Sequence, residues 1–433
     1  MKNKKESLVL GLALFAMFFG AGNLIFPPSI GASVGDRWHM AILGFFTTGI
    51  GLPLLGIMAF NKIGSLDKFA EKISPKFNKV YCSLLILSLG PLLAIPRTGA
   101  TTFEMGIAPN FPTINPIIVS IIYFSITLIM VINPSKIIDN IGKILTPIIL
   151  LMLASIIIKG IFFKIGTPIK AKSVENAFSF GFLEGYQTMD ALASVLMGSV
   201  IMSGLKAKGF SDRKVQKNLI IRAGIIASIG LALVYGGLLY LGATSSSVVS
   251  GLGKTTLTMY IADATLGQVG NKILGICVSA ACLTTSIGLV TVVGEYFSKI
   301  TKFSYKTIVT LTCIFSSAMS VIGVGAIIKI SVPILIILYP ITIILIMLNL
   351  FEVKNSIIYK TSICIAITTS IIEIGYNTLD IHTFEYFYNL IPFSKDGFIW
   401  FLPIILITPI ITIFGNLRKQ RKSTNNIYKA TKY

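Results

Sequence analysis

The chain has 433 residues, of which 54% are hydrophobic and only 12% are charged. An average soluble domain carries roughly 25% charged residues, so this composition excludes a soluble globular protein and indicates an integral membrane protein. The net charge of +20 is spread over short connections between apolar stretches rather than over one face, which argues against a nucleic-acid partner.

Apolar segments long enough to cross a lipid bilayer recur along the whole chain. Taking about 20 apolar residues for one crossing, we predict an all-α membrane protein with twelve transmembrane helices in one transmembrane domain, residues 1–433. Lys and Arg are concentrated in the connections on the side of both termini, which predicts cytoplasmic termini. The predicted segments are 7–30, 38–60, 79–102, 114–132, 141–163, 177–204, 219–242, 271–297, 306–324, 327–350, 357–376 and 398–416.

The first segment contains residues that a membrane helix normally avoids. Gly20, Gly22 and Asn23 are followed by Pro27 and Pro28. Glycine weakens a helix and proline removes a backbone donor, so we expect the helix to break here. Unwound backbone at membrane depth has to line a cavity or be buried in protein, and its carbonyl groups commonly hold a coupling cation. The first segment therefore predicts a transport site.

An arginine and a glutamate stand out in and directly after the third segment. A charge at bilayer depth costs about 3 kcal/mol or more unless it is paired or hydrated, so Arg97 is expected to face inward. Glu104, seven residues on, is one candidate partner, and Glu184 and Asp190 in the sixth segment are two others. A structural ion pair and a gating or coupling role are equally open for Arg97. The carboxylates are open as proton carriers, cation ligands or salt-bridge partners.

The sixth segment repeats the peculiarity of the first. Between Phe180 and Asp190 it holds Gly181, Glu184 and Gly185 within an apolar run. Two interrupted segments five crossings apart predict two five-helix repeats of inverted topology, with a broken first helix in each repeat. The predicted parts are the first repeat, 7–163, the second repeat, 177–350, accessory helices eleven and twelve, 357–416, and a cytoplasmic tail, 418–433.

Three oxygen groups converge in the eighth segment. The Ala281 carbonyl and the Thr284 and Thr285 hydroxyls lie at positions i, i+3 and i+4, on one helix face. Oxygen ligands of this kind suit a hard cation. An isolated pair of threonines more often bonds back to its own helix or joins neighbouring helices. Beside a broken first segment, the cation site is the favoured interpretation.

Four sequence phrases are similar to those of one known family. They resemble the BrnQ-type branched-chain amino acid:cation symporters, with similarity from Ser7 to about Gly415. The resemblance implies the leucine-transporter fold and sodium-coupled uptake of leucine, isoleucine and valine across a bacterial cell membrane, without a cofactor and without an obligate protein partner. The phrases are Phe19-Gly-Ala-Gly-Asn-Leu-Ile-Phe-Pro-Pro, Gly90-Pro-Leu-Leu-Ala-Ile-Pro-Arg-Thr-Gly, Gly181-Phe-Leu-Glu-Gly-Tyr-Gln-Thr-Met-Asp and Cys282-Leu-Thr-Thr-Ser-Ile-Gly.

The resemblance also implies roles for individual residues. Asn23 lies where sodium-coupled members of that fold have an amide beside the substrate carboxylate. The implied sodium ligands are the carbonyls of Ala16, Phe19 and Ala281 and the hydroxyls of Thr284 and Thr285. The substrate carboxylate is expected at backbone N–H groups near Gly20, Ala21 and Gly22, and its ammonium at carbonyls near Gly181, Glu184 and Gly185.

Two other classes of function compete with sodium symport. A proton-coupled amino acid symporter or exchanger would use Asp190, Glu184 or Glu104 as the titrating group. A channel or a non-transporting amino acid sensor would bind its ligand without accumulating it. An enzyme is disfavoured, because no nucleophile shares a segment with either His39 or His382 as its base.

Overall fold

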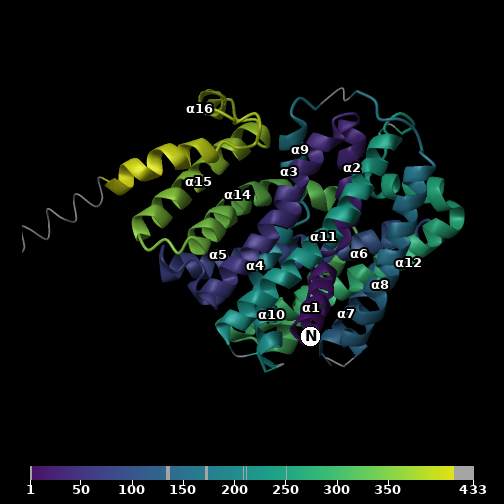
Figure 1. Cartoon of the computed structure of the whole chain (residues 1–433), viewed down its shortest axis with the longest axis horizontal. Coiled ribbons are helices and arrows are strands. Elements are labelled where there is room, and N and C mark those ends of the chain that lie inside the picture. Colours follow the sequence, from purple (N-terminus) through teal and green to yellow (C-terminus); the bar gives the residue numbers. More distant parts are fainter. Residues whose placement is uncertain are drawn as a thin grey trace, which may run out of the picture.

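A computed structural model describes residues 2–132, 137–170, 174–207, 209–210, 212–249 and 251–413. The regular elements of these residues are helices (Figure 1). The predicted tail, 418–433, lies outside the described residues. In chain order the elements are α1 (Lys2–Phe18), α2 (Ala21–Val34), α3 (Trp38–Phe46), η1 (Thr47–Gly51), α4 (Leu52–Ile63), η2 (Leu66–Lys68), α5 (Pro75–Leu87), η3 (Ser88–Leu92), α6 (Ala94–Thr101), η4 (Thr102–Ile107), α7 (Pro116–Ile132), α8 (Ile137–Phe162), α9 (Ala177–Tyr186), α10 (Asp190–Ala207), α11 (Arg213–Ser245), α12 (Lys254–Ile300), α13 (Tyr305–Ser320), α14 (Val324–Leu350), α15 (Ser356–Asn377), α16 (Thr383–Leu390) and a final helix, Phe401–Ile413.

Each of the twelve predicted segments coincides with one or more of these helices, which confirms the all-helical membrane architecture. The pair α1 and α2 forms one bent crossing. Three shorter apolar helices are α7, the second half of α8 and the final helix. The sixth predicted segment corresponds to α9 and α10, and the ninth to α13. Among the described residues, six continuous helical stretches are long and apolar enough to span a membrane unaided: Trp38–Ile63, Pro75–Ile107, Lys214–Ser245, Lys254–Ile300, Val324–Leu350 and Ser356–Asn377.

The bundle is held together by unusually close helix crossings at glycines. A Cβ atom added to Gly31 of α2 would lie 1.9 Å from the carbonyl oxygen of Leu239 in α11. A Cβ atom on Gly181 of α9 would lie 2.0 Å from the carbonyl oxygen of Ala41 in α3. Small residues let membrane helices approach to backbone contact. Both broken segments are therefore anchored tightly to a neighbouring helix.

The outer surface carries many large apolar side chains. Leu151, Leu233 and Ile276 are each exposed by about two thirds or more, at 70%, 71% and 69%. A soluble protein rarely exposes apolar residues so densely, and a bilayer is the solvent that suits them. The chain is thus a multi-pass membrane protein.

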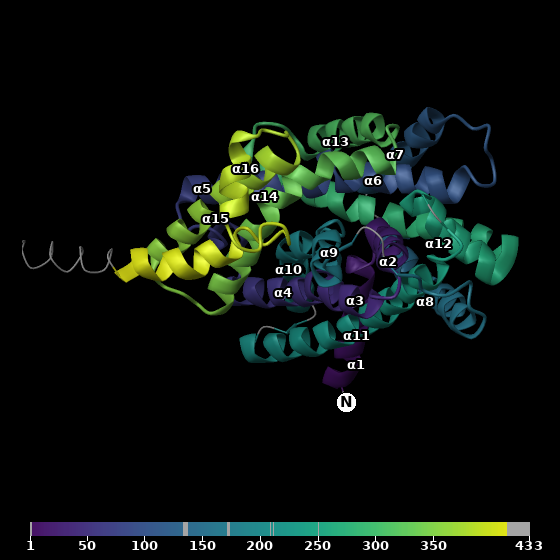
Figure 2. The ribbon, with the colours of Figure 1, turned by 90° about the horizontal axis from the view of Figure 1, so that it is seen from above.

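The C-terminal helices project from one end of the bundle. In both ribbon views, α15 and the final helix extend away from the remaining helices (Figure 1, Figure 2). The Ser362 and Thr408 hydroxyls, 3.2 Å apart, join these two helices to each other. Neither helix contributes to the cavity described below, which is the arrangement expected for accessory helices.

The longest helix, α12, has two parts that meet at a kink. Gly267 interrupts its 47 residues with φ of 68°, a left-handed conformation that favours glycine. We call residues 254–266, before the kink, the capping segment. The Thr258 hydroxyl of this segment donates to the Leu24 carbonyl of α2 at 3.4 Å. The capping segment therefore lies on the broken first crossing, while the rest of α12 forms the eighth.

Candidate substrate and cation site

The first crossing is broken at Phe19 and Gly20, which we call the first break. α1 ends at Phe18, α2 begins at Ala21, and the two helices are bent by 71°. Gly20 is extended, with φ of −117° and ψ of −169°, so the helical hydrogen-bond ladder stops there. The side-chain amide of Asn23 donates to the Phe18 carbonyl at 2.6 Å. This contact satisfies one of the backbone groups that the break exposes.

The sixth crossing is broken at residues 187–189, between α9 and α10, and we call these residues the second break. Met189 has φ of 62°, which residues with a side chain rarely adopt. The Thr188 hydroxyl donates to the backbone carbonyl three residues before it at 2.9 Å. The Gln187 side chain accepts a hydrogen bond from Ser331 of α14 at 2.7 Å. Polar side chains thus replace part of the interrupted backbone ladder.

A small cavity lies between the two breaks. Its volume is about 40 Å³, which holds roughly three water molecules. An amino acid can therefore enter only after the surrounding helices move apart. Methionine, leucine and alanine side chains supply the apolar part of the wall. The polar part of the wall consists of Asn23, Arg97, Thr98, Thr188, Asp190 and Thr285.

Asn23 connects the two breaks directly. Its Nδ2 atom, besides reaching Phe18, donates to Oδ2 of Asp190 at 2.8 Å and contacts the hydroxyl of Tyr235 on α11. Because an amide nitrogen has two hydrogens, it can serve two of these three acceptors at a time. The Tyr235 hydroxyl is itself a donor and is placed to serve Asp190. Asn23, Asp190 and Tyr235 are all buried and form one network.

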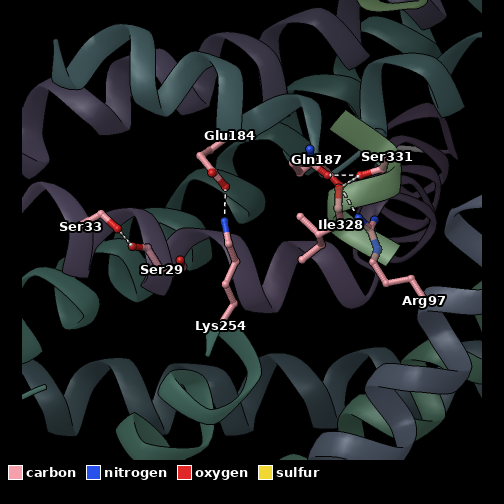
Figure 3. A network of polar contacts seen from close by, with 8 residues as sticks. All are labelled: Ser29, Ser33, Arg97, Glu184, Gln187, Lys254, Ile328 and Ser331. Carbon is pink, nitrogen blue, oxygen red and sulfur yellow. Dashed lines mark hydrogen bonds and ion pairs between the residues drawn. The ribbon is translucent and has the colours of Figure 1, made fainter. Parts of the chain in front are cut away.

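Arg97 on α6 enters the same cavity and is 4% exposed. Its Nη1 atom donates to the carbonyl of Gln187 in the second break at 2.6 Å, and Figure 3 shows this contact beside Ser331. Its Nη2 atom lies beside the first break, because a Cβ atom on Gly22 would be 3.0 Å from it. The guanidinium carbon is 5.6 Å from the centre of the Phe26 ring. Arg97 therefore touches both broken crossings.

The proposed partners of Arg97 separate in the structure. Glu104 accepts hydrogen bonds from Thr255 at 2.7 Å and from the Val324 N–H at 2.8 Å. Glu184 forms an ion pair with Lys254 (Figure 3). Asp190 is the one of the three that lines the cavity with Arg97.

The residues predicted to hold sodium come from two helices that meet at the first break. Thr285 of α12 lines the cavity, and its hydroxyl oxygen is 3.6 Å from the Cβ position of Gly20. The hydroxyl of the preceding residue, Thr284, donates to the Ala281 carbonyl at 2.9 Å. Ala16 lies in the last turn of α1, and the Phe19 ring stacks on Phe15 with centroids 5.2 Å apart. The structure thus brings α12 to the break.

The residues predicted to bind substrate fall into two groups. Gly20, Ala21, Gly22 and Asn23 all line the cavity. The group expected at the ammonium lies elsewhere, inside α9, where carbonyls are engaged in the helix. Gly181 and Gly185 give close packing against Ala41 and Thr48 of the neighbouring crossing, and Glu184 pairs with Lys254. The second break begins only after these residues, beyond Tyr186.

Several site residues gave no usable signal in the sequence. Tyr235 lies in the seventh crossing and Ser331 in the apolar tenth crossing. Each forms a hydrogen bond with a residue far away in the chain, Asn23 and Gln187 respectively. Lys254 stands among glycines and threonines of a connection. Gln187 and Thr188 differ from these residues, because they are polar residues in an apolar run and lie within the interruption predicted between Phe180 and Asp190.

Comparison with known proteins identifies the family. The family model described as "Branched-chain amino acid transport protein" matches residues 3–418. The branched-chain amino acid permease BraB of Bacillus subtilis is 39% identical, covering 96% of this chain and 97% of the permease. The branched-chain amino acid transport system 2 carrier protein of Pseudomonas aeruginosa is 36% identical, covering 95% and 96%.

Solved structures show the same fold. The inward-facing conformation of Mhp1 superposes with a TM-score of 0.63 at 13% identity, covering 95% of this chain and 91% of Mhp1. A Na⁺-coupled sialic acid symporter superposes with a TM-score of 0.60 at 15% identity, covering 94% and 89%. These similarities confirm the predicted leucine-transporter-like fold. The relatives of this chain are permeases and carriers, so the chain is a transport protein and not an enzyme. It belongs to the branched-chain amino acid transport protein family.

Proposed function

We propose that this protein imports leucine, isoleucine and valine by symport with sodium, through alternating access. The observation that carries the proposal is the polar cavity enclosed by two broken crossings, with Thr285 of α12 beside the first break. Broken helices facing each other at the membrane midplane are the usual site of substrate and coupling ion in secondary transporters. The names of the relatives supply the substrate class.

In this proposal sodium lies between α12 and the end of α1. Sodium favours about five oxygen ligands, and two helices that meet at a break can offer them. The similar sialic acid symporter is described as Na⁺-coupled, which supports this choice of ion. The proposed ligands are the carbonyls of Ala16, Phe19 and Ala281 and the hydroxyls of Thr284 and Thr285.

The substrate carboxylate lies at the start of α2, near the N–H groups of Gly20, Ala21 and Gly22. The positive end of the α2 dipole favours a negative group at this position. The apolar wall of the cavity takes the branched side chain after the helices separate. One methylene changes the binding free energy by only about 1–3 kcal/mol, so such a pocket accepts all three branched-chain amino acids.

The protein is placed in the bacterial cell membrane with both termini in the cytoplasm. This orientation follows the distribution of Lys and Arg along the sequence. With this orientation the capping segment, 254–266, faces the outside of the cell, where it lies on α2. No cofactor enters the proposal. Gradient energy alone drives the transport cycle.

Uptake into proteoliposomes tests the coupling ion. Purified protein is reconstituted, and uptake of labelled isoleucine is followed under an inward sodium gradient or, separately, under an inward proton gradient. Sodium-driven accumulation supports the proposal. Absence of accumulation under either gradient, in a preparation that binds isoleucine, contradicts it.

The cation ligands are tested by substitution on α12. Thr284→Ala and Thr285→Ala each remove one oxygen, so the sodium concentration for half-maximal uptake should rise about tenfold or more. Thr291→Ala is the matched control, because the Thr291 hydroxyl bonds back to the carbonyl of Ile287 on the same helix at 2.8 Å, outside the cavity. An unchanged sodium dependence in both variants would remove these threonines from the ion site.

Proton coupling is the second candidate, and Asp190 is the observation that favours it. This carboxylate is 5% exposed and lines the cavity. Intramembrane carboxylates commonly mark proton pathways. Accumulation driven by the proton gradient in sodium-free buffer would support this candidate against sodium coupling.

A further inference from the structure

Two buried side chains of opposite charge face the cavity from different helices. Arg97 comes from α6 and Asp190 from the first turn of α10. They are 4% and 5% exposed, and both line the cavity between the breaks. We propose that these two residues bind the two charged ends of the substrate, with Arg97 holding the α-carboxylate and Asp190 the α-ammonium. This inference rests on the proposed amino acid transport.

The hydrogen bonds of Arg97 leave donors for a ligand. A guanidinium group has five N–H donors. In the described structure, Nη1 donates to the Gln187 carbonyl, whereas Nε has no hydrogen-bond partner although it is buried. A buried unpaired donor is costly and rare in folded proteins. A carboxylate is the group that a guanidinium fork binds best, through two parallel hydrogen bonds.

The position of Arg97 coincides with the expected carboxylate position at α2. Its Nη2 atom is 3.0 Å from the Cβ position of Gly22, and the Cα of Thr188 is 3.3 Å from the same point. Any side chain at Gly22 would fill the space where Arg97 meets the start of α2. The glycine therefore allows the guanidinium and the α2 N–H groups to converge on one anion.

Asp190 provides the acceptor that the glycines of α9 do not. It begins α10, directly after the second break, and its Oδ2 accepts from Asn23 at 2.8 Å. A carboxylate has about four lone-pair positions, so it can accept from an ammonium as well. Carbonyls near Gly181 and Gly185 are engaged within α9 and lie outside the cavity lining.

The charges of this site match a zwitterion. Arg97 and Asp190 sum to zero, and an amino acid at neutral pH also has one positive and one negative group. Inserted between the two residues, an amino acid leaves every buried charge with a partner. An amine or a carboxylic acid has only one of the two charged groups of an amino acid. When such a ligand binds, the charge of either Arg97 or Asp190 stays buried without a partner, which protein interiors tolerate poorly. The site should therefore reject amines and carboxylic acids that share the side chain of leucine.

A ligand series with charge-removing variants tests this assignment. Binding of labelled leucine to purified protein is competed with leucine, with isopentylamine, which has no carboxylate, and with 4-methylpentanoate, which has no amine. In the wild-type protein both analogues should bind about 100-fold more weakly than leucine, or worse. An analogue that competes within about threefold of leucine in the wild-type protein overturns the assignment for the group it lacks.

The variants should separate the two ends. Arg97→Gln should weaken leucine binding about 100-fold while changing isopentylamine binding less than threefold. Asp190→Asn should weaken leucine similarly while sparing 4-methylpentanoate. Ratios between ligands do not depend on how much of a variant is folded. Equal loss for leucine and both analogues in each variant would show a structural ion pair and overturn the proposal.

Further variants keep the test decisive if one charge alone disturbs folding. The double variant Arg97→Gln with Asp190→Asn has no unpaired buried charge, and its preference for leucine over both analogues should disappear. A retained preference overturns the proposal. Arg37→Gln and Asp263→Asn, outside the cavity lining, are the controls and should keep the wild-type ratios. If the wild-type protein binds no leucine, the proposed function itself fails, which is distinct from leucine binding with the wrong ratios.

Discussion

Lys254 and Glu184 form an ion pair of 2.5 Å between the first residue of α12 and the body of α9. The ammonium of Lys254 also lies 4.8 Å from the centre of the Phe26 ring in α2. Thr255, the next residue, donates to Glu104 at 2.7 Å. The capping segment is thereby fastened to both broken crossings and to the third one.

Removing this ion pair should loosen the capping segment. The two side chains are 27% and 22% exposed, so solvent screening limits the pair to about 1 kcal/mol or less. Lys254→Met should therefore raise the open population about two- to fivefold. The measurement uses Thr258→Cys in a background without the native cysteines. Adding Lys254→Met to this background should increase the rate of reaction with an impermeant maleimide by that factor.

Two further variants test whether the ion pair itself holds the capping segment. Lys272→Met removes an exposed lysine of the same helix beyond the kink and should leave the maleimide rate unchanged. The exchange of charges, Lys254→Glu with Glu184→Lys, should restore the wild-type rate. A rate that stays high in the exchanged variant would mean that packing of the lysine on Phe26, rather than the pair, closes the segment.

Substituting Gly31 should weaken the protein strongly. An added methyl group would meet the Leu239 carbonyl of α11 at 1.9 Å, and backbone cannot move aside as a side chain can. Overpacking of this kind costs about 1–3 kcal/mol or more. Gly31→Ala should lower the unfolding temperature in detergent clearly. Gly288→Ala, where a Cβ atom meets nothing within 4 Å, should not; equal effects would contradict the close crossing.

Substituting Gly22 should damage binding more than stability. An added methyl group would press on the Arg97 guanidinium and on Thr188. Because the long arginine side chain can shift while the helices stay in place, we expect Gly22→Ala to raise KM for leucine about tenfold with little change in unfolding temperature. Gly325→Ala, in open space at the start of α14, is the control for both measurements. An unaltered KM would show that Gly22 does not contribute to substrate binding.

Removing the Ser331 hydroxyl should act on the second break. Ser331→Ala leaves the buried amide oxygen of Gln187 without this donor, a loss of about 1–3 kcal/mol. Uptake kinetics and unfolding temperature should both change. Ser362→Ala also removes a buried hydroxyl contact, but it joins α15 to the final helix. That variant should lower stability while sparing KM, and an identical KM for both variants would refute the role of Ser331.

The sequence predicted the first break well because glycine, asparagine and proline occur together there. The predicted interruption between Phe180 and Asp190 contains the second break, but glycine has a different use within it. Gly181 and Gly185 serve close packing against the second crossing, whereas the unwound residues are Gln187, Thr188 and Met189. A left-handed methionine has no sequence signature.

The pairing of Arg97 with Glu104 failed for a geometric reason. Seven residues correspond to two turns of an α-helix, which places both side chains on one face. Residues 102–107 form a π-helix, η4, with more residues per turn, so the register shifts between the two positions. Contacts such as Asn23 with Tyr235 were out of reach because their partners lie far apart in the chain.

The kink at Gly267 has a consequence for how the two ends of the carrier communicate. Lys254, which fastens the capping segment, and Thr285, beside the first break, belong to the same 47-residue helix. A shift of the part that holds Thr285 can be passed to the capping segment through two rigid helical parts that meet at Gly267, without passing through loops or through a chain of side-chain contacts. Substitutions that stiffen or loosen the kink at Gly267 should therefore change when the capping segment closes relative to binding at the first break. They should leave the residues at both ends of the helix unchanged.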